Sequence, residues 1–109
     1  MKISELIPTP TSKIALEGFE VGSLPSGWHS HVLTDDSGDI LFIGATKYLN
    51  HILKLHSEKF AKLKGIEGKI NCYFTCSSEE EYLKIETSWM EQHRAITGKY
   101  PSCNVIVNI

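Results

Sequence analysis

The feature that most restricts the fold is a pair of short apolar runs joined by a turn. Residues 29–34 and 39–44 are rich in apolar and β-branched side chains, and Asp35-Asp36-Ser37-Gly38 lies between them. Asp and Ser favour tight turns, and Gly permits the backbone angles that close them. The sequence therefore predicts that His29–Thr34 and Asp39–Gly44 form an antiparallel hairpin.

A third strand and two helices follow from the side-chain periods. Residues 69–76 alternate between apolar and polar, which predicts a strand with one buried face. Thr46 is a plausible N-cap for a helix that runs to about Lys64, with His56 filling a gap in its apolar stripe. The capping box at Ser78-Glu79-Glu80-Glu81 predicts a second helix that stops at Gly98.

These elements predict a single α+β domain over residues 1–109, with a small, mainly antiparallel sheet and two main helices in the order β-β-α-β-α. The 109 residues, of which 41% are hydrophobic, suffice for one modest core. Residues 1–23 read as an irregular lead-in, with a short strand near 13–16. The apolar tail at 103–109 predicts either a short last strand or a tucked end.

The charge is unevenly distributed along the chain, although the net charge is only −2. Residues 1–45 carry two lysines against six acidic residues, residues 46–70 six lysines against two, and residues 71–109 three basic residues against five acidic ones. A basic middle segment is a candidate surface for a polyanion, although a solvated lysine-rich helix face explains it equally well. The candidate phosphate-binding residues are Lys47, His51, Lys54, Lys59, Lys62 and Lys64.

No run of about 20 apolar residues and no apolar leader stretch is present, so we expect a cytoplasmic protein with no membrane partner. Three cysteines are an odd number, and free thiols are the expectation. Cys72 and Cys76 could ligate zinc together with His93, but their spacing is not that of a zinc knuckle. His29 and His31 share a strand face and form a second, weak candidate metal pair.

The first half of the chain resembles the GIY-YIG nuclease domain. Leu24-Pro25-Ser26-Gly27, Asp35, Gly38 and the run 42–47 are similar to the version in the bacterial excision-repair incision protein. When Phe42-Ile43-Gly44 is aligned with the family's "YVG" strand, the family's "GVY" strand falls on His29-Ser30-His31. The resemblance covers residues 24–104, leaves 105–109 as a tail, and implies a bacterial or phage protein.

The second half resembles the same family. Residues 85–90, followed by Tyr100-Pro101-Ser102-Cys103-Asn104, are similar to the family's "LExxLIxxxxPxxN", in which the Glu holds a divalent metal. The resemblance therefore implies that Glu86 is a ligand for Mg²⁺ or Mn²⁺, if the protein is active. The element order of the family is the order predicted above.

Three of the four positions that carry the family's chemistry are changed. The two tyrosines are replaced by His31 and Phe42, and the arginine on the first helix is replaced by Ile52, while Glu86 remains. Phosphodiester hydrolysis needs a base, positive charge at the phosphate and usually a metal, and neither Phe nor Ile supplies any of these.

Three interpretations follow from this degenerate active site. The first is a non-catalytic GIY-YIG-like module that binds DNA or RNA or regulates another protein. The second is a divergent metal-dependent endonuclease with His31 as general base and Glu86 as metal ligand, because a histidine has a near-neutral pKa. The third is a protein-interaction or inhibitor domain that binds no nucleic acid.

Overall fold

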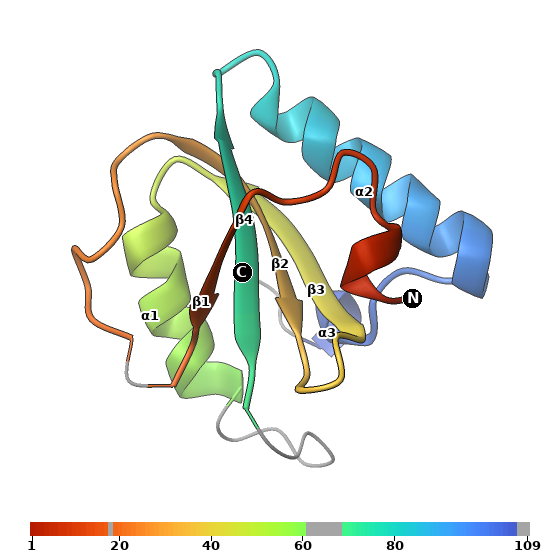
Figure 1. Cartoon of the computed structure of the whole chain (residues 1–109), viewed down its shortest axis with the longest axis horizontal. Coiled ribbons are helices and arrows are strands. Elements are labelled where there is room, and N and C mark those ends of the chain that lie inside the picture. Colours follow the sequence, from red (N-terminus) through yellow and green to blue (C-terminus); the bar gives the residue numbers. More distant parts are fainter. Residues whose placement is uncertain (18, 61–68, 107–109) are drawn as a thin grey trace.

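The computed structural model describes residues 1–17, 19–60 and 69–106, and it confirms an α+β fold (Figure 1). A short 3-10 helix, Ile3–Glu5, precedes the first strand. The strands are β1 (Ser12–Ala15), β2 (Trp28–Thr34), β3 (Ile40–Thr46) and β4 (Asn71–Ser77). The helices are α1 (Leu49–Phe60), α2 (Tyr82–Thr97) and α3 (Ser102–Ile106).

The four strands form one antiparallel sheet in the order β1-β4-β2-β3. The predicted hairpin is confirmed, because β2 pairs with β3 in a register that sets His31 opposite Gly44. The predicted third strand is β4, which pairs with the other side of β2, and the lead-in strand is β1. Strands β1 and β3 are therefore the two edges of the sheet.

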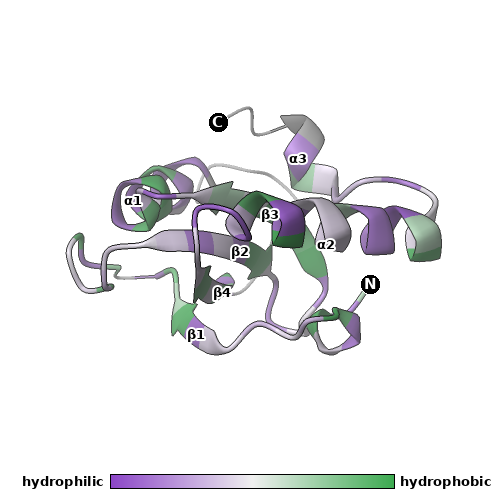
Figure 2. Ribbon diagram, turned by 90° about the horizontal axis from the view of Figure 1, so that it is seen from above, coloured by the Kyte–Doolittle hydropathy of each residue, from purple (hydrophilic) through white to green (hydrophobic). Residues whose placement is uncertain are grey.

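Each face of the sheet buries its own apolar cluster. Val32 and Leu33 are adjacent in β2 and fully buried, so their side chains point to opposite faces. Leu33 belongs to a cluster that includes Leu53 of α1, whereas Val32 packs with Trp89 of α2. Figure 2 looks along the strands, so the sheet is seen as a row of four strands from β1 to β3. Helices α1 and α2 lie on opposite sides of this row, and α3 lies beyond the β3 edge.

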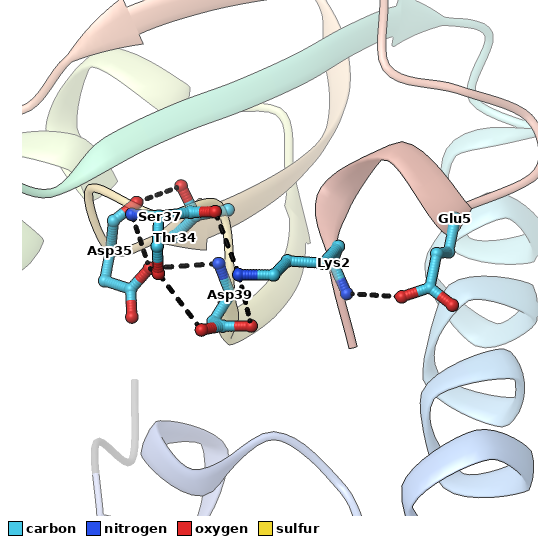
Figure 3. A network of polar contacts seen from close by, with 6 residues as sticks. All are labelled: Lys2, Glu5, Thr34, Asp35, Ser37 and Asp39. Atoms are coloured by element: carbon cyan, nitrogen blue, oxygen red, sulfur yellow. Dashed lines mark hydrogen bonds and ion pairs between the residues drawn. The ribbon is translucent and has the colours of Figure 1, made fainter.

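The β2–β3 turn is held by its own side chains and by the N-terminus (Figure 3). The Asp35 carboxylate accepts hydrogen bonds from the backbone amides of Ser37 and Asp39, both at 3.0 Å, which is how Asp stabilises a turn. The Lys2 ammonium lies 3.1 Å from the Asp39 carboxylate, and the Ile3 amide donates to the Gly38 carbonyl. The lead-in is therefore anchored to the hairpin.

Both predicted hydroxyl groups contact the backbone ahead of their helix, but the helices begin later than predicted, at Leu49 and Tyr82, and the N-cap residue of α2 is Glu81, which makes no side-chain cap hydrogen bond. The Thr46 hydroxyl accepts the Tyr48 amide at 2.9 Å just before α1, and the Ser78 hydroxyl accepts the Glu81 amide at 3.2 Å just before α2. Helix α2 ends at Gly98, whose φ of 82° is the left-handed conformation that favours glycine. The predicted end of the first helix, near Lys64, lies outside the described residues.

Of the two alternatives for the C-terminal segment, a last strand or a tucked end, the described part is not a strand. Residues 102–106 form α3, which packs beside β3. The Asn104 side-chain carbonyl accepts the Ile43 amide at 3.0 Å, and its NH₂ donates to the Ile43 carbonyl at 2.9 Å. These are the edge groups that another strand would have to pair with, so the asparagine side chain takes the place of a fifth strand. Residues 107–109 lie outside the described residues.

Candidate functional site

A pocket of about 240 Å³ opens at the β3 edge of the sheet. Residues 42–46 of β3 line it, together with side chains from four other elements. These are His31 of β2, Ile52 and His56 of α1, Glu86 of α2 and Asn104 of α3. The pocket is smaller than the roughly 300–1,000 Å³ of drug-sized ligand sites, so it suits a hydrated ion, a phosphate group or one inserted side chain.

Two buried imidazoles meet inside this pocket. The Nε2 atoms of His31 and His56 lie 3.3 Å apart, and the two side chains are 1% and 0% exposed. The Phe42 ring packs against both, with centroid distances of 5.8 Å to His31 and 4.7 Å to His56. The pair is thus fixed by β2, β3 and α1 together.

Gly44 makes room for the His31 ring. A Cβ placed on Gly44 would lie 2.7 Å from Cε1 of His31 and 2.8 Å from Cε1 of Phe42, closer than real Cβ contacts. The two residues are directly opposite each other in the β2–β3 register, so the imidazole lies over the glycine backbone. The absence of a side chain at this position is what admits the imidazole pair.

Burial keeps both imidazoles neutral. Desolvation lowers the pKa of His31 to about 3, with a smaller contribution from the neighbouring His56, and it lowers the pKa of His56 to about 4. The hydrogen bond between the rings needs one Nε2–H and one bare Nε2, so the pair contains one ring of each tautomer. The Nδ1 atom of His31 has no hydrogen-bond partner among the described residues.

Glu86 places a carboxylate in the same pocket. Its side chain is half-buried, and desolvation raises its pKa. Within residues 1–17, 19–60 and 69–106, no hydrogen bond or ion pair reaches this carboxylate. A carboxylate that is partly removed from water without a partner is well placed to attract a cation.

A hard divalent cation fits Glu86 as its only ligand among the described residues. In the part of the chain that the structure describes, no three His, Cys, Asp or Glu side chains are grouped as metal ligands. Mg²⁺ is often bound by one or two carboxylates together with substrate phosphates and waters, so a single glutamate is compatible with Mg²⁺ or Mn²⁺. Such an ion would supply positive charge to a bound phosphate.

The predicted site residues divide into two groups. His31 and Glu86 share the pocket, and the two apolar replacements, Phe42 and Ile52, line it as well. The candidate phosphate-binding residues lie elsewhere: Lys47, His51, Lys54 and Lys59 are exposed and are not among the residues that line the pocket. Lys62 and Lys64 lie outside the described residues.

Two of the exposed lysines have local partners. Lys47 Nζ lies 5.4 Å from the ring centroid of Trp28 and 5.3 Å from that of Tyr48. Lys54 Nζ lies 3.8 Å from a Glu58 carboxylate oxygen one helical turn away, an exposed pair of little energetic weight. Both lysines are exposed in spite of these contacts, so a polyanion can reach both ammonium groups.

Sequence reasoning missed His56 and the role of Gly44. His56 was assigned to the apolar stripe of its helix, and it is indeed buried there, but its Nε2 faces the His31 imidazole. The available signal was its spacing, because His56 follows Ile52 by four residues and so lies on the same helix face. For Gly44 there was no such signal, because the predicted strand ended at Gly44, whereas β3 continues to Thr46 and so makes Gly44 an interior residue.

The weaker metal candidates are not assembled. Cys72 is buried on the α1 face of the sheet, whereas Nδ1 of His93 contacts the Lys99 carbonyl at 2.7 Å near the end of α2. His29 shares its strand face with His31, but its Nδ1 lies 3.1 Å from the Gly27 carbonyl, and the imidazole that contacts His31 is that of His56. The cysteines of the described residues are free.

When the chain is compared with family models, with curated proteins and with solved structures, nothing matches. The resemblance to the GIY-YIG domain therefore depends on the residues quoted above. In the described residues, no helix is long and apolar enough to cross a bilayer.

Proposed function

We propose that this protein is a catalytically degenerate GIY-YIG-like domain that acts in the cytoplasm as a nucleic-acid-binding or regulatory module. The observation that carries the proposal is the composition of one pocket. Five residues of the pocket fall on positions of the family pattern, although as many as 73 residues separate them along the chain. All five line the same 240 Å³ pocket: His31, Phe42, Ile52, Glu86 and Asn104. A chance resemblance of short motifs gives no reason for these positions to converge.

The chemistry of the pocket favours binding over hydrolysis. Phe42 and Ile52 present hydrocarbon where the GIY-YIG pattern has a tyrosine hydroxyl and an arginine guanidinium, and hydrocarbon cannot stabilise charge on a phosphate. His31 is neutral but is a poor general base, because a group whose pKa is about 3 has little tendency to take a proton from water. Its Nε2 is also engaged with His56.

In this proposal, the affinity for nucleic acid comes from exposed lysines on α1 and in the segment before it. Lys47, Lys54 and Lys59 carry exposed ammonium groups over a stretch of 13 residues, whereas the pocket itself holds the Glu86 carboxylate. A phosphate backbone would therefore be attracted to α1 and would reach the pocket only with a cation at Glu86. Binding of this kind depends on counterion release and shows little sequence preference.

A fluorescence-anisotropy titration with labelled single- and double-stranded DNA and RNA tests the proposal. If three phosphates are neutralised, affinity for duplex DNA should fall about 40-fold between 50 and 200 mM salt. A Lys47→Ala, Lys54→Ala, Lys59→Ala variant should bind more weakly and with a shallower salt slope.

The matched control is Lys13→Ala, Lys84→Ala, Lys99→Ala, which removes the same charge from β1, from α2 and from just after α2. This variant should bind as the unaltered protein does. Absence of binding at about 50 mM salt would reject the nucleic-acid proposal and favour a protein partner.

One observation favours an active, divergent endonuclease as a second candidate. Glu86 and His31 share a pocket, and the carboxylate has no partner among the described residues. A plasmid-nicking assay with Mg²⁺ or Mn²⁺ separates the two candidates: we expect the unaltered protein to cleave no faster than Glu86→Ala. Metal-dependent nicking that is lost in both Glu86→Ala and His31→Ala would instead establish the endonuclease.

The same assay can test the apolar replacements. Because Phe42 and Ile52 line the pocket, Phe42→Tyr and Ile52→Arg together add a hydroxyl and a guanidinium to the lining of the pocket that Glu86 shares. This double variant is the one we expect to gain nicking activity, and Phe42→Leu with Ile52→Leu is its control for altered packing.

A further inference from the structure

Two buried imidazole nitrogens face each other inside the pocket. The Nε2 atoms of His31 and His56 are 3.3 Å apart, near the long end of hydrogen-bonding distance. We propose that His31 and His56 form a two-histidine chelate for a tetrahedral transition-metal ion of the zinc type, bound through both Nε2 atoms. This site is distinct from the hard-cation role of Glu86.

The distance itself selects the geometry. Two ligands at metal–nitrogen distances of about 2.0–2.1 Å are about 3.3 Å apart when the angle at the metal is tetrahedral. At the 90° angle of square-planar or octahedral sites the same bonds place them about 2.9 Å apart. The observed 3.3 Å between the two Nε2 atoms therefore equals the separation that a tetrahedral ion requires.

The surroundings hold both rings in this arrangement. The imidazoles are nearly inaccessible to solvent, the Phe42 ring packs against both, and the His31 ring lies over Gly44. Rings that are held by packing lose little freedom when they bind a metal, which favours chelation by only two protein ligands.

The described residues supply two ligands of the coordination shell. In the described residues no third His, Cys, Asp or Glu side chain joins the pair as a ligand group, so waters or an anionic ligand must fill the remaining positions. Both histidines line the 240 Å³ pocket, which has space for such ligands. Imidazole is a preferred ligand for zinc and for Co²⁺, but not for Mg²⁺.

The test is a zinc titration of chelator-treated protein by calorimetry, with cobalt as a spectroscopic substitute. A Cys76→Ser background removes the exposed thiol as a competing ligand. We expect one equivalent of Zn²⁺ to bind, and Co²⁺ to give the intense visible absorption of a tetrahedral site. His31→Gln and His56→Gln should each weaken zinc binding at least about tenfold.

The matched control is His29→Gln, which changes another buried histidine on the same strand face. It should retain zinc binding, whereas a loss of binding in this variant as well would overturn the proposal. Circular dichroism verifies that each variant is folded before binding is compared.

The unaltered protein provides a second readout that does not depend on a variant being folded. Nitrogen NMR of the imidazoles should show one Nε2–H tautomer in the metal-free pair, and Nδ1–H tautomers on both rings after zinc is added. Zinc binding without this tautomer change, or with equal affinity in His56→Gln, would place the metal elsewhere and overturn the proposal. Nucleic-acid binding measured in the presence of a chelator tests the proposed function separately.

Discussion

Replacing Gly44 by alanine should destabilise the protein, although alanine is otherwise the better strand residue. The new Cβ would lie 2.7 Å from the His31 ring and 2.8 Å from the Phe42 ring, and both rings are buried. Such overpacking lowers the free energy of unfolding by about 1–3 kcal/mol. Alanine also reduces the conformational entropy of the unfolded chain, which offsets about 0.4–1 kcal/mol of this loss. We therefore expect a net loss of about 1–2 kcal/mol in the free energy of unfolding, or a fall of about 4–8 °C in Tm.

The assay is urea unfolding at pH 7 of a double-mutant cycle with His31→Ala. In the His31→Ala background the main clash is gone, so Gly44→Ala should cost at least about 1 kcal/mol less than in the unaltered protein. The backbone at Gly44 is not in the left-handed region, so strain from φ does not enter the comparison. Equal costs in the two backgrounds would refute the account of Gly44 as the space for the imidazole.

Two further predictions concern the same edge of the sheet. Burial lowers the pKa of His31 and His56 in the folded state, so the unfolded state binds more protons as the pH falls below about 6.5, and stability is lost progressively toward pH 4. Each histidine should lower the free energy of unfolding by about 2 kcal/mol at pH 5. In urea unfolding, His56→Gln should therefore lose less stability between pH 7 and pH 5 than the unaltered protein does. Asn104→Ala removes both hydrogen bonds to Ile43 and should cost about 1–3 kcal/mol, with faster hydrogen exchange at the Ile43 amide; unchanged exchange would contradict the edge role of Asn104.

Local patterns were enough to predict most of the secondary structure. Turn residues between two apolar runs predicted the hairpin, alternation predicted β4, and helical apolar periods predicted α1 and α2, although both helices begin later than Thr46 and Ser78 suggested. These signals are local, because a turn, a strand period or a cap is decided by residues within a few positions of one another. The C-terminal segment was harder, since Cys103 and Asn104 adopt a helix whose contacts with β3 are long-range.

The sequence by itself determined the order of β2, β3, α1, β4 and α2, and it named His31 and Glu86 as the residues with usable chemistry. Only the tertiary structure decided which groups face each other in the pocket. The sequence could not show that Gly44 leaves room for His31, or that His56 approaches it to 3.3 Å, because 25 residues separate the two histidines along the chain. Their contact arises from the packing of α1 against the sheet, and burial in that packing is also what makes both imidazoles neutral.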